Sequence, residues 1–97
     1  MHTVEHITTD KSGLMDPSHG IGLTIEHGHI PAGLFASLRA ECERLGGTFA
    51  HYRNDTAGDS ECDCMMPSAA AQAAMLRHCQ NKLTNTHKQY ASLYTIA

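Results

Sequence analysis

Residues 47–66 read GTFAHYRNDTAGDSECDCMM and predict a β-hairpin around which the rest of the fold can be arranged. The first part, residues 47–53, is rich in the Thr, Phe and Tyr that are typical of strands. Residues 54–59 are turn-forming types, residues 60–66 alternate again, and Pro67 ends the pattern. Two strands joined by a short polar turn are expected to pair antiparallel.

The alternation within residues 60–66 assigns side chains to the two faces of a strand, since successive residues point to opposite sides. We expect Cys62, Cys64 and Met66 to face the core, and Glu61, Asp63 and Met65 to face solvent. A buried free cysteine behaves as a small hydrophobic residue. The cysteines of this segment are therefore expected to be core residues.

Two further strands are expected before the hairpin. Residues 21–27, IGLTIEH, place Ile21, Leu23 and Ile25 on one face at a period of two. Residues 2–10 mix β-branched and polar residues in the same way, and residues 11–20 between them are loop by their Gly, Pro and Ser content.

The chain between residues 31 and 45 has the period of a helix. Pro31 suits a first helical position because it has no N–H to leave unpaired. An apolar stripe follows at spacings of three and four: Leu34, Phe35, Leu38, Cys42 and Leu45. Gly46 and Gly47 supply a left-handed stop.

A second helix is expected from residue 69 to residue 83, with Ser68 as its N-cap. The apolar period continues to Leu93, so we expect residues 86–96 to be helical as well. The helix either breaks near Thr84 and Asn85 or projects from the domain and packs on a partner.

These elements predict one α+β domain covering residues 1–97. The order β-β-α-β-β-α favours a four-stranded, mostly antiparallel sheet with both helices on one face. The other face of such a sheet is left open to a second subunit or a ligand.

Size and charge narrow the class of protein. The chain has 97 residues with two Phe and no Trp, so burying surface against a second copy would stabilise it, and we expect a homodimer. Seven Lys and Arg are scattered among ten Asp and Glu, which argues against nucleic acid as a partner. No apolar run approaches the length of a membrane span, and the N-terminus has no signal-peptide pattern, so we expect a cytoplasmic protein with reduced cysteines and no membrane partner.

Four Cys and eight His supply many soft and borderline metal ligands. Cys62 and Cys64 are one residue apart, however, which on a strand separates them by about 7 Å, whereas two sulfurs on one zinc lie about 3.8 Å apart. His78 and Cys79 are adjacent and would point about 100° apart on a helix. We predict no cofactor, and keep Zn or Cu(I) on these four residues as an alternative.

Three histidines are candidates for acid–base catalysis. His27 and His29 lie where a strand runs toward a helix, and His51 lies on the first strand of the hairpin. If these strands were neighbours, the three side chains could converge on one side, either as a hydrolytic or metal centre with general acid–base chemistry or as the polar surface of an amphipathic sheet.

The sequence thus favours a non-enzymatic, dimeric module that binds a ligand or a protein, over a soft-metal protein or a small histidine enzyme. The predicted partner-facing surface is the C-terminal segment 86–96, with Tyr90, Leu93 and Tyr94 as its interface residues, because this apolar stripe has little of its own domain left to pack on.

Overall fold

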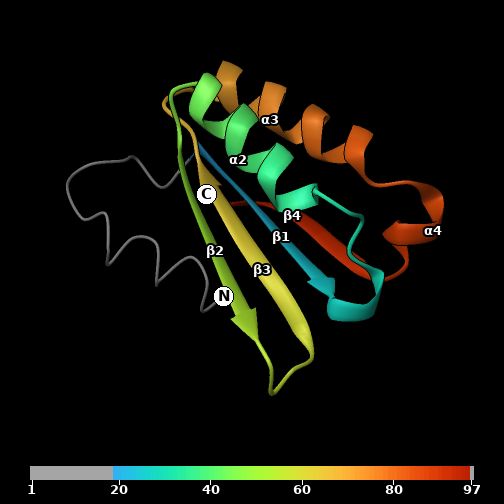
Figure 1. Ribbon diagram of the computed structural model, residues 1–97. Helices are drawn as coiled ribbons and strands as arrows, with labels where there is room; N and C mark the ends of the chain where they lie inside the picture. Colours follow the sequence, from blue (N-terminus) through green and yellow to red (C-terminus); the bar gives the residue numbers. More distant parts are fainter. Residues whose placement is uncertain (1–18, 97) are drawn as a thin grey trace.

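The computed structural model describes residues 19–96 and has the predicted fold class, a four-stranded antiparallel sheet with its helices on one face (Figure 1). The strand expected at residues 2–10 lies outside the described residues. The elements are β1 (Gly20–Glu26), the 3₁₀ turn η2 (His27–His29), α2 (Leu34–Arg44), β2 (Thr48–Asn54), β3 (Asp59–Met65), α3 (Ala69–Lys82), α4 (Asn85–Lys88) and β4 (Ala91–Ile96).

The strands lie in the order β2-β3-β1-β4, and every neighbouring pair is antiparallel. The unit β1-α2-β2 therefore has β3 between its two strands, and the unit β3-α3-β4 has β1 between its strands. This is the split β-α-β connectivity of ferredoxin-like sheets. Because such a fold hosts many unrelated activities, it does not by itself indicate a function.

The ends of the helices follow from local sequence. α2 is preceded by Gly33 at φ 74°, and Gly46 at φ 84° provides the expected left-handed stop. Pro31 was expected at the first helical position, but it lies in the turn before α2, and the helix starts three residues later at Leu34. The expected N-cap of α3 is confirmed, since the Ser68 hydroxyl accepts a hydrogen bond from the Ala71 amide at 3.1 Å.

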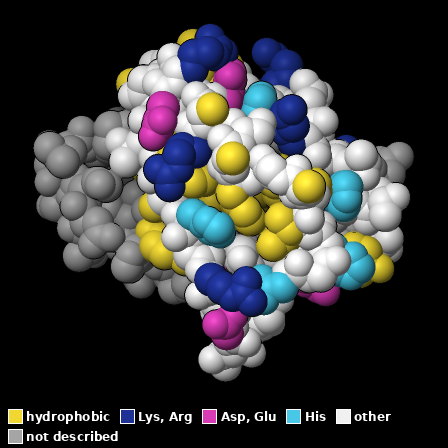
Figure 2. Space-filling model, viewed as in Figure 1, with side chains coloured by type: hydrophobic (Ala, Val, Ile, Leu, Met, Phe, Trp, Pro, Cys, Tyr) yellow, Lys and Arg dark blue, Asp and Glu magenta, His cyan; other side chains and the backbone are white. Residues whose placement is uncertain are grey.

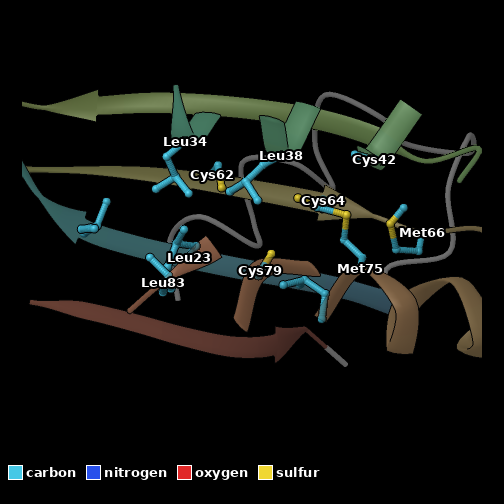
Figure 3. Packing of buried hydrophobic residues seen from close by; sticks show 12 residues of the cluster. Leu23, Leu34, Leu38, Cys42, Cys62, Cys64, Met66, Met75, Cys79 and Leu83 are labelled. Atoms are coloured by element: carbon cyan, nitrogen blue, oxygen red, sulfur yellow. The ribbon is translucent and has the colours of Figure 1, made fainter. Parts of the chain in front are cut away.

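The main core lies between the sheet and the helices, and sulfur fills much of it (Figure 3). β1 contributes Ile21, Leu23 and Ile25, each at most 1% exposed. The inward face of the hairpin's second strand is as predicted: Cys62, Cys64 and Met66 are buried among residues of both helices, including Leu38, Cys42, Met75 and Cys79.

The outward face of β3 differs from the expectation. Glu61, Asp63 and Met65 were expected to face solvent, but they are 4%, 0% and 1% exposed. One physical reason is a second hydrophobic cluster on this face, in which Met65 and Ile96 pack with Ala50, Tyr52 and Tyr94. The Tyr94 ring lies directly over Gly22, where an added Cβ would overlap it. The far face of the sheet is therefore partly a second core.

The prediction of a helical segment over residues 86–96 holds for residues 86–88, which lie in α4, and is wrong for residues 91–96, which form β4. α3 ends at Lys82, Leu83 is extended, and Thr84 caps the four-residue α4 through reciprocal hydrogen bonds with His87. Of the two alternatives left open, a break near Thr84 and Asn85 or a projecting helix, the structure has the break. After it the chain enters β4, which pairs with β1 along its whole length. That ladder satisfies the backbone groups of β4 that face β1, and it outweighs the helical period that residues 86–96 share with α3.

Candidate functional site

The four cysteines gather in the main core although they come from three different elements. Cys42 lies on α2, Cys62 and Cys64 on β3, and Cys79 on α3, and all are at most 1% exposed. They are free thiols. Figure 3 shows their sulfur atoms between the sheet and the helices, in the same layer as Met66 and Met75.

The environment of these thiols disfavours their reactive thiolate form. A hydrogen bond with the Cys64 thiol, together with burial, raises the pKa of Cys42 far above its ordinary value. The hydrogen bond from Cys42 lowers the pKa of Cys64, but the contact with Cys62 and burial outweigh it, so this pKa is raised as well. Burial raises the pKa of Cys79 to about 12. Neutral thiols in an apolar layer are suited to packing.

The metal candidates do not form a recognisable metal centre in the described part of the chain. Between residues 19 and 96, no group of three or more His, Cys, Asp and Glu side chains is arranged to hold a metal ion. The Nε2 atom of His78 lies 3.2 Å from the hydroxyl of Ser37, which links α3 to α2.

The three candidate catalytic histidines are held in separate places. β2 and β1 are not neighbours, because β3 lies between them, so the condition for convergence is not met. The His51 ring stacks on Phe35 with centroids 4.0 Å apart, whereas the His29 ring stacks on Tyr90 at 3.4 Å. His27 lies beyond the end of β1, and its amide donates to the carbonyl of Gly58.

The predicted interface residues belong to β4 and the residue before it. Tyr90 precedes the strand, Leu93 lies opposite Leu23 on the helix side, and Tyr94 lies on the far side over Gly22. They do not share one exposed face as they would on a helix. What they share is the C-terminal edge of the sheet, which becomes the candidate site.

β4 is one of the two outer strands, and it lacks the features that usually protect a sheet edge. Charged residues, prolines and bulges on outer strands discourage other chains from pairing with them. β2, the other outer strand, carries Arg53 and His51. β4 reads ASLYTI, without a charge or a proline, and its pairing with β1 runs without a bulge from Ala91 to Ile96.

The hydrogen bonds of β1 indicate which amides of β4 are open. The Glu26 amide donates to the Tyr90 carbonyl at 3.1 Å, so Tyr90 directs its backbone groups toward β1. Since these directions alternate along an antiparallel strand, Ser92, Tyr94 and Ile96 also bond to β1. Ala91, Leu93 and Thr95 direct their N–H and C=O groups to the outer edge, where no strand within residues 19–96 pairs with them.

A groove of about 280 Å³ adjoins this edge on the helix side, between β4 and the end of α3. Its apolar lining is formed by Leu83, Ala91 and Leu93, with Gln80 and Lys88 supplying polar atoms. Leu93 therefore has both an outward backbone and a side chain in the groove. A chain that paired with β4 would place every second side chain on this side of the sheet.

Charged side chains are dispersed on the face of the molecule seen in Figure 2. On the face seen in Figure 2, the Lys and Arg side chains lie apart from one another, with acidic side chains and histidines between them. No helix in residues 19–96 has both the length and the apolar character needed to cross a membrane. Comparisons with protein-family models, curated proteins and solved structures found no match.

Leu93 was predicted to be an interface residue, but the strand on which it lies was not predicted. A signal was available: ASLYTI contains Tyr, Thr and Ile, which favour strands, and no charged residue. The apolar period of 3.6 residues in the preceding helix continues to Leu93, and it favoured a helix over this strand.

Proposed function

We propose that this protein is a non-enzymatic binding module that takes up an extended polypeptide segment at the open edge of β4. The observation that carries the proposal is the combination, at one place, of three outward-facing backbone amides, an uncharged strand and a groove with an apolar side formed by Leu83, Ala91 and Leu93. Strand addition of this kind obtains affinity from main-chain hydrogen bonds and specificity from the pockets that receive alternate side chains.

The groove supports the choice of ligand. Leu83, Ala91 and Leu93 form the apolar side of the groove, and Leu93 is only partly buried, so it offers apolar surface beside the strand. A bound segment with an apolar side chain opposite this surface would remove it from water, at about 25 cal/mol per Å² of apolar area. The ladder between β1 and β4 runs without a bulge, and it sets the direction that the added strand follows.

The placement of the histidines supports a binding role over a catalytic one. His29 and His51 each stack on an aromatic ring from another element, which gives both a packing role. The pKa of His51 is lowered by burial and by Arg39, and no carboxylate takes part in that shift. An acid–base pair would require a second titrating group within hydrogen-bond reach of the same reacting atom.

The experiment is a peptide titration followed by amide NMR, at a protein concentration where sedimentation velocity shows a monomer, so that a second copy does not already cover the edge. The probe is a synthetic peptide with the sequence YASLYTI, acetylated and amidated so that its ends carry no charge. We expect the largest shift changes, and new protection from hydrogen exchange, at the amides of Leu93 and Thr95. The amide of Ser92, which bonds to β1, serves as the internal control and should change little.

The matched control ligand is a peptide that differs only by proline in place of the leucine, since it lacks the central N–H. If the first peptide leaves the Leu93 and Thr95 amides unchanged at millimolar concentration, the proposed function is wrong. It is also wrong if both peptides act equally, because main-chain pairing would then contribute nothing.

A further inference from the structure

We propose that the segment that occupies the β4 edge in solution is β4 of a second copy of the chain, antiparallel and in a register centred on Leu93. This inference rests on the proposed function and specifies its partner. It makes the protein a homodimer with one sheet continuous across both copies.

Two geometric conditions select the register. Residues that lie opposite each other in an antiparallel pair point to the same face, so the helix-side residues Ala91, Leu93 and Thr95 must face one another. These are also the residues with outward backbone groups. A two-fold axis at Leu93 puts Leu93 against its own counterpart and Ala91 against the partner's Thr95, so that each outward amide of the strand finds an outward carbonyl.

The charge of the strand favours a copy of itself as the partner. A two-fold axis brings like residues close together, so any charge on β4 would be opposed by the same charge in the partner. None of the six residues of β4 is charged. The nearest charged residue upstream, Lys88, lies beyond the end of the partner's strand in this register. β2 is less suited to self-pairing, because it carries Arg53.

The side chains also match across the axis. On the helix side, Leu93 would contact the partner's Leu93. The two grooves lined by Leu83 would lie on either side of this contact. On the far side, Tyr94 would lie against the partner's Ser92, a small side chain that leaves room for the ring. A 97-residue chain buries a modest fraction of its surface alone, so covering this edge is a gain in stability.

Disulfide trapping tests both the partner and the register. In the proposed pairing the two Cα atoms at position 93 lie about 5.5 Å apart, within the range that a disulfide spans. Leu93→Cys should therefore form a covalent dimer when oxidised glutathione is added. Thr95→Cys is the matched control: its two copies would lie about 13 Å apart, four residues out of step, and should stay unlinked.

The sites of linkage are read by mass spectrometry of the non-reduced peptides. The native cysteines are buried and should not contribute. A dimer linked through position 93 supports the inference. Linkage at Thr95→Cys in place of Leu93→Cys would overturn the register, and monomeric protein for both variants would overturn the second copy as the partner.

Two proline variants test the same edge without a cross-link. Thr95→Pro removes an outward N–H and should abolish the dimer in sedimentation velocity while the ladder to β1 persists. Ser92→Pro removes an N–H that bonds to β1 and should lower the melting temperature instead. A folded Thr95→Pro protein that remains dimeric would contradict the inference; if this variant fails to fold, the trapping experiment decides.

Failure of this inference is distinguishable from failure of the proposed function. A protein that stays monomeric but binds the YASLYTI peptide at Leu93 and Thr95 retains the function and loses the second-copy partner. A protein that neither dimerises nor binds the peptide loses both.

Discussion

Replacing Gly47 with alanine should destabilise the protein by about 2 kcal/mol, because the added methyl group has no space in the sulfur-rich core. Gly47 lies between the end of α2 and the start of β2. Its backbone passes so close to β3 that an ideal Cβ would stand 2.8 Å from the carbonyl oxygen of Met65 and 3.0 Å from the Cys42 sulfur, and would overlap the terminal methyl of Met66.

The rigidity of these neighbours sets the magnitude. The Met66 methyl is the end of a flexible side chain and can turn away at small cost, but the Met65 carbonyl belongs to a paired strand. It stands about 0.6 Å inside the 3.4 Å at which ordinary contact begins. Overpacking of this kind typically costs about 1–3 kcal/mol. In a domain of this size, 2 kcal/mol lowers the melting temperature by about 8–16 °C.

The assay is urea unfolding followed by far-UV circular dichroism, with Gly28→Ala as the matched control. An added Cβ at Gly28 meets no atom within 4 Å, so this variant should be neutral or slightly stabilised. In a Met66→Ala background the cost of Gly47→Ala should fall by less than about 0.5 kcal/mol, since the flexible Met66 methyl contributes little to it and the Met65 carbonyl stays in place. A Gly47→Ala protein as stable as the Gly28→Ala protein would refute the tight packing of α2 and β3 around this glycine.

Three further predictions concern thiols, pH and helix capping. The buried thiols should resist Ellman's reagent in the folded protein and react only as it unfolds; stoichiometric labelling under native conditions would contradict their role in packing. Burial and Arg39 lower the pKa of His51, so its contribution to stability should be complete above its unfolded pKa of about 6.5 and be lost as the pH falls below that value. His51→Gln should therefore weaken the fall in unfolding free energy between about pH 7 and pH 5, and an unchanged slope would exclude this role. Ser68→Ala should cost about 1 kcal/mol by removing the cap of α3, whereas Thr56→Ala in the exposed hairpin loop should stay within about 0.5 kcal/mol; equal losses would contradict the cap.

The sequence predicted the elements whose signals are local. The period of two in β1, the left-handed stop at Gly46 and the cap at Ser68 each depend on a few neighbouring residues, and each is present in the structure. The inward placement of Cys62 and Cys64 also followed from alternation alone.

The sequence could not settle features that depend on distant partners. Residues 91–96 form a strand by pairing with an edge of β1. No residue close to them in the sequence indicates that β1 is their partner. Asp63 is buried although alternation alone assigned it to solvent, and its face of the sheet carries a second hydrophobic cluster built from residues of β2, β3 and β4. The convergence of four cysteines from α2, β3 and α3 likewise depends on how the helices cross the sheet.

The candidate site was predicted in part. Leu93 was expected at a partner-facing surface because its apolar stripe had little of its own domain left to pack on, and the structure places it beside a groove at a sheet edge that no strand within residues 19–96 covers. Tyr94 was expected beside it, but the strand turns this ring to the far face over Gly22. Whether Leu93 contacts a partner stays a prediction.

The most direct test of the binding role of β4 is residue-resolved hydrogen exchange of the wild-type protein at low and high concentration. Ser92 and Tyr94 bond to β1, and their amides should be protected at both concentrations. We expect the Leu93 and Thr95 amides to exchange quickly in dilute protein and to become protected as the protein concentration rises. Fast exchange of these two amides at every concentration, with the YASLYTI peptide present as well as absent, would contradict the binding role of β4.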